Sequence, residues 1–102
     1  MQVNGSAQAE KVLGYYQVVG VPTAIGFDSI AGGTIPEGTE FVEVFVAAES
    51  CRWRADGTPP TAAVGMPIAV GQTQVFTMQT LADVRIIDQT GPATLNVTFY
   101  GR

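Results

Sequence analysis

The sequence predicts an all-β domain, an antiparallel two-sheet β-sandwich of about eight short strands. Short runs rich in Val, Ile, Phe and Tyr recur along the chain and are separated by turns of Gly, Pro and Asp. Within several runs, apolar and polar residues alternate with the two-residue period of a strand. No segment combines the 3.6-residue apolar repeat with the capping residues of a long helix. The spacing leaves the strand order open, and a jelly roll is one arrangement that it allows.

The chain has 102 residues, which is the length of one domain. Residues 1–10 are small and polar, and we expect a flexible N-terminal arm there, because little apolar surface is present to offset the entropy lost on ordering. Residues 11–102 then form a single β-sandwich domain. The first ten residues also lack the apolar stretch of a signal peptide, so none is predicted.

The expected strands follow one another at short intervals along the domain. In chain order they are Lys11–Val19, Ala24–Phe27, Glu40–Ala48, Ser50–Ala55, Pro67–Val70, Gln74–Met78, Val84–Asp88 and Thr94–Tyr100. The first ends before Gly20 and Pro22, and the brief second run is followed by a Gly-rich loop over residues 29–38. Between the sixth and seventh expected strands, Thr80–Asp83 is predicted to form a single turn.

Two of these strands have patterns that predict their place in the sandwich. Glu40–Ala48 is apolar on both faces, which indicates a central strand, or one covered by a second layer or a subunit. Thr94–Tyr100 alternates cleanly, so Leu95, Val97 and Phe99 are expected to face the core.

The charge balance argues against nucleic acid and membranes as partners. The formal net charge is −4, and five basic residues are too few to neutralise many phosphates. No basic amphipathic segment suggests a membrane surface, and no run approaches the roughly 18 apolar residues of a membrane span. Only 14% of the residues are charged, which leaves much neutral surface for contact with neighbouring subunits.

The residue types needed for catalysis are largely missing. The chain has no histidine, which removes Ser-His-Asp and Cys-His arrangements and the usual zinc ligand sets. Cys51, the one cysteine, is expected to be a small buried hydrophobe. Glu40 and Glu43 point to opposite faces of their strand and do not form a hydrolytic pair. We therefore predict no enzymatic activity, no metal site and no cofactor.

Five residues are the candidates for an interface: Arg52, Arg54, Tyr15, Tyr16 and Tyr100. Arg52 and Arg54 share one strand face, where they can pair with Glu43 or Glu49 on an adjacent strand or with a carboxylate of a neighbouring subunit. We hypothesise that at least one of these two arginines is interfacial, because the planar guanidinium is favoured at interfaces.

The aromatic residues allow a second interpretation. The three tyrosines and Trp53 together have the ring faces that a sugar-binding platform on a sandwich would need. The favoured interpretation of Trp53 is nevertheless that it anchors the core, as a lone tryptophan does in many small sandwiches.

The region Gly38–Tyr100 resembles the head decoration, or cement, proteins of tailed bacteriophages. The residues that carry this resemblance are the segments Ala47–Arg54, Asp56–Met66, Ile68–Gly71, Leu81–Ile87 and Leu95–Tyr100. The resemblance implies a β-sandwich that binds the major capsid protein on the outer capsid lattice and stabilises the head. It also implies a homo-oligomer, with a trimer favoured, located on the capsid surface of the virion and in the host cytoplasm before assembly. It transfers no catalytic residue.

Two alternatives remain at this point. One is a tail or head-fibre attachment component of the virion, in which Trp53 and the tyrosines contact host glycans. The other is a small carbohydrate-binding β-sandwich module that acts outside a virion.

Overall fold

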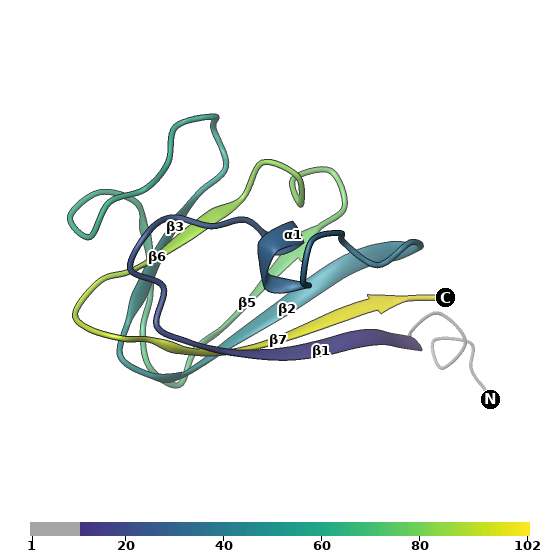
Figure 1. Cartoon of the computed structure of the whole chain (residues 1–102), viewed down its shortest axis with the longest axis horizontal. Coiled ribbons are helices and arrows are strands. Elements are labelled where there is room, and N and C mark those ends of the chain that lie inside the picture. Colours follow the sequence, from purple (N-terminus) through teal and green to yellow (C-terminus); the bar gives the residue numbers. More distant parts are fainter. Residues whose placement is uncertain (1–10) are drawn as a thin grey trace.

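Two antiparallel sheets face each other and enclose one apolar core between them (Figure 1). The computed structural model describes residues 11–102, so the expected N-terminal arm, residues 1–10, lies outside the described residues. The fold class is the one that the sequence predicts: within residues 11–102 the structure has seven strands and one short helix. No helix in this range is long and apolar enough to cross a membrane.

The longer sheet has four strands in the order β1-β7-β2-β5, and the shorter sheet has three in the order β4-β3-β6. The elements are β1 (Lys11–Val19), α1 (Phe27–Ile30), β2 (Thr39–Ala48), β3 (Cys51–Arg54), β4 (Met66–Ile68), β5 (Thr73–Thr77), β6 (Arg85–Asp88) and β7 (Thr94–Gly101). Between β5 and β6, residues 80–84 form the expected turn, in which the Thr80 carbonyl accepts from the backbone amides of Asp83 and Val84.

The eighth expected strand, Ala24–Phe27, is reduced to one residue. Ile25 forms an isolated antiparallel bridge with Ile86, and each of the two backbone amides donates to the other residue's carbonyl. Beyond Ile25 the chain turns into α1 and does not continue as a strand. Phe27 and Ile30 are three residues apart, so one helical turn points both side chains into the core, where they are buried.

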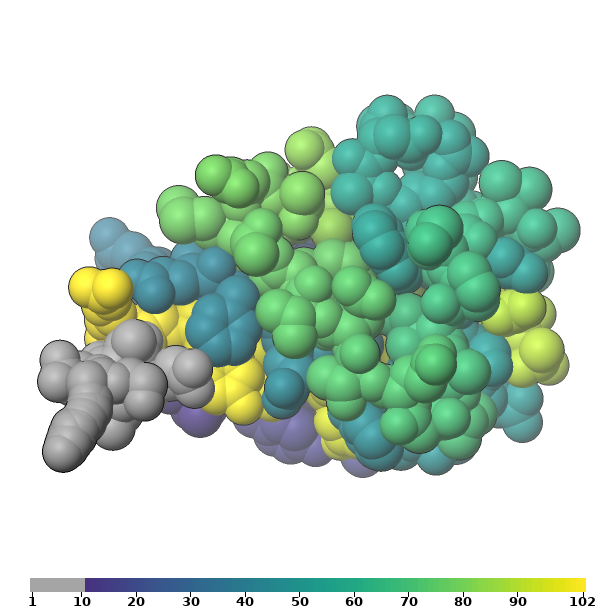
Figure 2. All heavy atoms as spheres, turned by 180° about the vertical axis from the view of Figure 1, so that it is seen from behind, coloured from purple at the N-terminus to yellow at the C-terminus, as the bar shows by residue number. Residues whose placement is uncertain are grey.

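If Ile25 is counted as an edge strand, the strand order of the shorter sheet is Ile25-β6-β3-β4. Successive segments then cross from one sheet to the other at every connection except the one between β3 and β4. This is the topology of a jelly roll, with one edge strand shortened to a bridge. The loop of residues 55–65, which joins β3 to β4 within the shorter sheet, projects from one end of the molecule (Figure 2).

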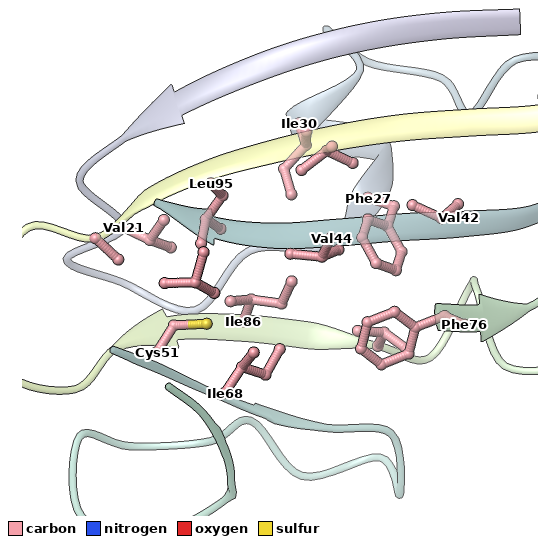
Figure 3. Close-up of a cluster of buried hydrophobic side chains, with 14 of the residues drawn as sticks. Val21, Phe27, Ile30, Val42, Val44, Cys51, Ile68, Phe76, Ile86 and Leu95 are labelled. Carbon is pink, nitrogen blue, oxygen red and sulfur yellow. The ribbon is translucent and has the colours of Figure 1, made fainter. Parts of the chain in front are cut away.

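The core is formed by the inward faces of both sheets together with α1 (Figure 3). Leu95, Val97 and Phe99 of β7 are fully buried, which confirms the predicted inward face of that strand. The alternate residues of β2 are equally buried, and β2 lies between β7 and β5, so the prediction of a central strand is also confirmed. Phe27 meets Phe76 and Phe99 edge-on, with ring centroids 5.3 and 6.1 Å apart.

Candidate functional site

The side of the longer sheet that is turned away from the core is a regular, nearly uncharged surface, which we call the outer face. In-register pairing across β1, β7, β2 and β5 places its side chains in three rows. The rows are Val12, Tyr100, Phe41, Thr77; then Tyr15, Thr98, Glu43, Val75; then Gln17, Asn96, Phe45, Thr73. Among these twelve positions Glu43 is the one charged residue at neutral pH, and four positions are aromatic.

Several of the apolar side chains on the outer face are open to solvent. Val12 and Tyr15 on β1 are 57% and 55% exposed, and Val75 on β5 is 49% exposed. Phe45, near the centre of the sheet, is 39% exposed. These residues come from three of the four strands, so the apolar surface extends across the sheet and is not confined to one edge.

Three of the four aromatic rings of the outer face, those of Phe41, Tyr100 and Tyr15, are held by their neighbours. Phe41 and Tyr100 stack with ring centroids 4.8 Å apart and an interplanar angle of 15°. The Tyr100 hydroxyl donates to a Glu43 carboxylate oxygen at 3.4 Å. On the adjacent strand pair, the Tyr15 hydroxyl donates to the Asn96 side-chain oxygen, which also accepts from the Gln17 amide at 3.3 Å. Side chains that are already oriented lose little entropy when a partner binds.

Tyr15 and Tyr100 therefore lie on the outer face, but Tyr16 does not. Strand alternation turns Tyr16 inward, where it is half-buried and meets Phe99 edge-on at 5.7 Å. The structure thus brings two of the three candidate tyrosines to one surface and uses the third in the core.

Arg52 and Arg54 lie on the opposite side of the molecule, on the outward side of the shorter sheet. Arg52 donates from Nε to the Ala62 carbonyl at 3.0 Å and from Nη1 to the Gly65 carbonyl at 2.7 Å. It therefore fastens the loop of residues 55–65 to β3. This contact differs from the expected pairing with Glu43 or Glu49, because those residues belong to β2 and the turn that follows it.

Arg54 is paired within its own loop. Its guanidinium makes two hydrogen bonds to the Asp56 carboxylate, at 3.0 and 2.5 Å. This hydrogen-bonded pair lowers the pKa of Asp56 and raises the pKa of Arg54. The carboxylate partner of Arg54 is therefore Asp56, two residues along the chain, in place of the expected Glu43 or Glu49.

Trp53 packs against the core, as the favoured interpretation predicts, and meets Phe76 edge-on at 4.9 Å. It also forms one wall of a largely apolar hollow of about 330 Å³ beside the loop of residues 55–65. The hollow is lined by Trp53, Arg54, Ala55, Asp56, Val64, Gly65 and Met66. It is separate from the outer face, so Trp53 does not form a single platform with Tyr15 and Tyr100.

Two groups that are chemically reactive in principle have structural roles: the Cys51 thiol in the core and the half-buried Asp88 carboxylate at the end of β6. Cys51 is completely buried, and burial, with a smaller contribution from nearby Asp88, raises the pKa of its thiol to about 11. The Asp88 carboxylate accepts the backbone amides of Val21 and Ala93 at 2.9 to 3.0 Å, which ties two crossover connections together. Within residues 11–102 no three His, Cys, Asp or Glu side chains gather as metal ligands.

The sequence pattern does not single out Phe41, Phe45, Val12 and Val75 as members of one surface. Alternation within each strand already separates Phe41 and Phe45 from the inward valines of Glu40–Ala48. The pairing of β2 with β7 and β5 was needed as well, because only the strand order shows that these residues lie beside Tyr15 and Tyr100.

Comparison of the chain with protein-family models, curated proteins and solved structures finds no match.

Proposed function

We propose that this protein is a structural subunit whose outer face docks onto a lattice of other protein subunits. The observation that carries the proposal is the composition of the three rows: four aromatic residues, uncharged aliphatic and polar neighbours, and Glu43 as the single charge. Protein interfaces are enriched in aromatic residues and depleted of charge at their centre, so this surface is suited to protein contact.

The resemblance to phage head decoration proteins favours the outer surface of a capsid as the lattice, with the major capsid protein as the partner. The area of the outer face is consistent with a repeated, individually weak contact. Four strands about 4.8 Å apart and three rows about 6.8 Å apart cover roughly 400 Å². A stable interface buries about 800 Å² per partner, so one outer face alone supports weak binding that many copies on a lattice would reinforce.

The test is binding to empty capsids. Purified protein is mixed with expanded, empty capsids assembled from the major capsid protein encoded in the same genome, and bound protein is measured by co-sedimentation and by surface density in electron micrographs. We expect Phe45→Glu to reduce binding at least tenfold, because it places a second carboxylate beside Glu43 in the centre of the docking surface.

The matched control is Val64→Glu, which adds the same charge to the far side of the molecule, where Val64 is 54% exposed. It should bind as the wild type does. Unaltered binding by Phe45→Glu, or no surface density with wild-type protein, would reject the proposal.

A second candidate function uses the same surface. Tyr15 is exposed on the outer face, and Phe41 and Tyr100 stack on each other there beside the Glu43 carboxylate. Aromatic rings with neighbouring polar groups are the elements of a glycan site. This would correspond to an attachment component of a tail or head fibre, or to a small carbohydrate-binding module. Binding of defined oligosaccharides on an array, lost in Tyr15→Ala, would favour it over capsid docking.

A further inference from the structure

The four sheet edges of the described molecule differ in how they are protected from pairing with another chain. β4 is three residues long and contains Pro67, which has no N–H to donate. The outer edge of β6 is occupied by Ile25, whose amide and carbonyl both bond to Ile86. β5 is five residues long. β1, in contrast, has nine residues, contains no proline and has Lys11 as its only charge.

Exposed edges are commonly protected by shortness, proline, charge or a covering segment, because their free N–H and C=O groups are a template for another strand. Within residues 11–102, β1 has none of these protections along Tyr15–Val19, and its only strand partner there is β7. Its one irregularity, a register shift between Val12 and Gly14, lies before this stretch. Its Tyr15 and Val19 side chains are 55% and 69% exposed. This edge is therefore the one that is open to pairing.

The backbone groups on the open edge can be identified from the ladder with β7. The Gly20 amide donates to the Ala93 carbonyl at 2.8 Å, so the facing pair Gly20–Ala93 is a hydrogen-bonded pair. Bonded and non-bonded pairs alternate in an antiparallel ladder, so Val18 and Tyr16 also bond to β7. It follows that the amides and carbonyls of Tyr15, Gln17 and Val19 point away from β7.

We propose that β1 pairs with β1 of a second copy of this chain, antiparallel and about a two-fold axis at Gln17. In this register Gln17 faces Gln17 of the second copy, and Tyr15 of each chain faces Val19 of the other. The three facing pairs each exchange two backbone hydrogen bonds. An aromatic residue opposite a β-branched one is a favourable cross-strand pair, and both side chains lie on the outer face.

Charge does not oppose this pairing. Lys11 is the only charged residue of β1, and antiparallel pairing about Gln17 places the two Lys11 residues at opposite ends of the contact. The two longer sheets join into one sheet of eight strands, with their outer faces side by side. The combined outer face then covers roughly 800 Å², the size of a standard interface on one partner.

The alternative of β1 pairing with β5 of the next copy is less favourable. β5 is shorter, and a head-to-tail contact leaves a free β1 and a free β5 at the two ends, so growth continues unless a ring closes. The two-fold contact uses the same edge twice and closes at two copies. A trimer, which the resemblance implies, would need a different contact, so the number of copies tests the proposal. The dimer does not depend on what the outer face binds.

The experiment is sedimentation equilibrium of the wild-type chain, Gln17→Pro and Gln17→Ala. Proline at residue 17 removes an N–H that points away from β7, so the β1–β7 ladder keeps its bonds while the contact between copies loses two. We expect the wild type and Gln17→Ala to be dimers, and Gln17→Pro to dissociate at least tenfold more readily with an unchanged far-ultraviolet circular dichroism spectrum. Wild-type protein that sediments as a monomer or a trimer, or Gln17→Pro that dimerises normally, overturns the proposal.

Amide hydrogen exchange of the wild type provides a test that does not depend on the folding of a variant. In the dimer, the amides of Tyr15, Gln17 and Val19 should be protected, and their exchange should become faster on dilution. Those of Tyr16 and Val18, which bond to β7, should be protected at every concentration. Rapid exchange of the first three amides at high protein concentration would exclude pairing along this edge.

Discussion

The outward sides of the two sheets differ in how their polar groups are used. On the shorter sheet, Arg52 bonds to the carbonyls of the loop of residues 55–65, and Arg54 pairs with Asp56. Arg85 on the same side donates to the carbonyls of Ala82 and Val84. On the longer sheet, the polar side chains of the outer face bond to one another across neighbouring strands.

This difference shows how one small sandwich can separate stability from recognition. The charged residues of the shorter sheet satisfy loop carbonyls and a loop carboxylate, so they hold irregular chain in place. The outer face of the longer sheet consists of four strands in register and needs no such support. Its aromatic and apolar groups therefore remain available to a flat partner.

The largest expected effect is the loss of stability when a charge is placed on the inward side of the longer sheet. Val97 is completely buried on β7, so Val97→Asp places an unpaired charge in the core. We expect a loss of about 3 kcal/mol or more in the free energy of unfolding. For a domain of this size that corresponds to a fall of about 12 °C or more in melting temperature, measurable by calorimetry.

The matched control is Asn96→Asp, on the adjacent position of the same strand. The new carboxylate has the shape of the amide and keeps the oxygen that accepts from the Tyr15 hydroxyl and the Gln17 amide. Its effect on the free energy of unfolding should stay below about 1 kcal/mol, as at most surface positions. Similar losses in the two variants would mean that the faces of β7 are not distinguished by burial.

The sequence alone predicted the fold class and the inward face of β7, because hydrophobic alternation and turn residues are local signals. Ala24–Phe27 was expected as a strand, but the burial of Phe27 and Ile30 against distant rings favours a helical turn there. The partners of Arg52 and Arg54 were not predictable, since they depend on how the loop of residues 55–65 folds. The outer face required the strand order, which spacing does not encode.

The second prediction concerns the inward side of β3, where Cys51 lies behind the two arginines. Burial raises the pKa of the Cys51 thiol from 9.0 to about 11, so between these values the folded protein binds a proton that the unfolded chain releases. The neutral thiol therefore supports the fold below pH 9, and its contribution is lost as the pH rises to 11. The resulting loss in the free energy of unfolding is about 2–3 kcal/mol.

Denaturant unfolding at pH 8 and pH 11 of the wild type and Cys51→Val checks this prediction. All other side chains are the same in the two proteins, so the difference between their losses of stability isolates the thiol. We expect the wild type to lose about 2 kcal/mol more than Cys51→Val over this range. An equal loss of stability in the two proteins would show that the thiol ionises in the folded protein as readily as in the unfolded chain.

The smallest expected effect is the difference in stability between variants of the two arginines of β3. Arg52→Ala removes two hydrogen bonds to loop carbonyls and should lower the free energy of unfolding by about 1–2 kcal/mol. It should also speed hydrogen exchange of the Thr61 and Val64 amides, which bond within the loop. Arg54→Ala breaks only the exposed pair with Asp56 and should leave both quantities close to those of the wild type. If the two variants loosen the loop equally, Arg52 is not what fastens it, and the arginine pair would be free for the interfacial role expected from the sequence.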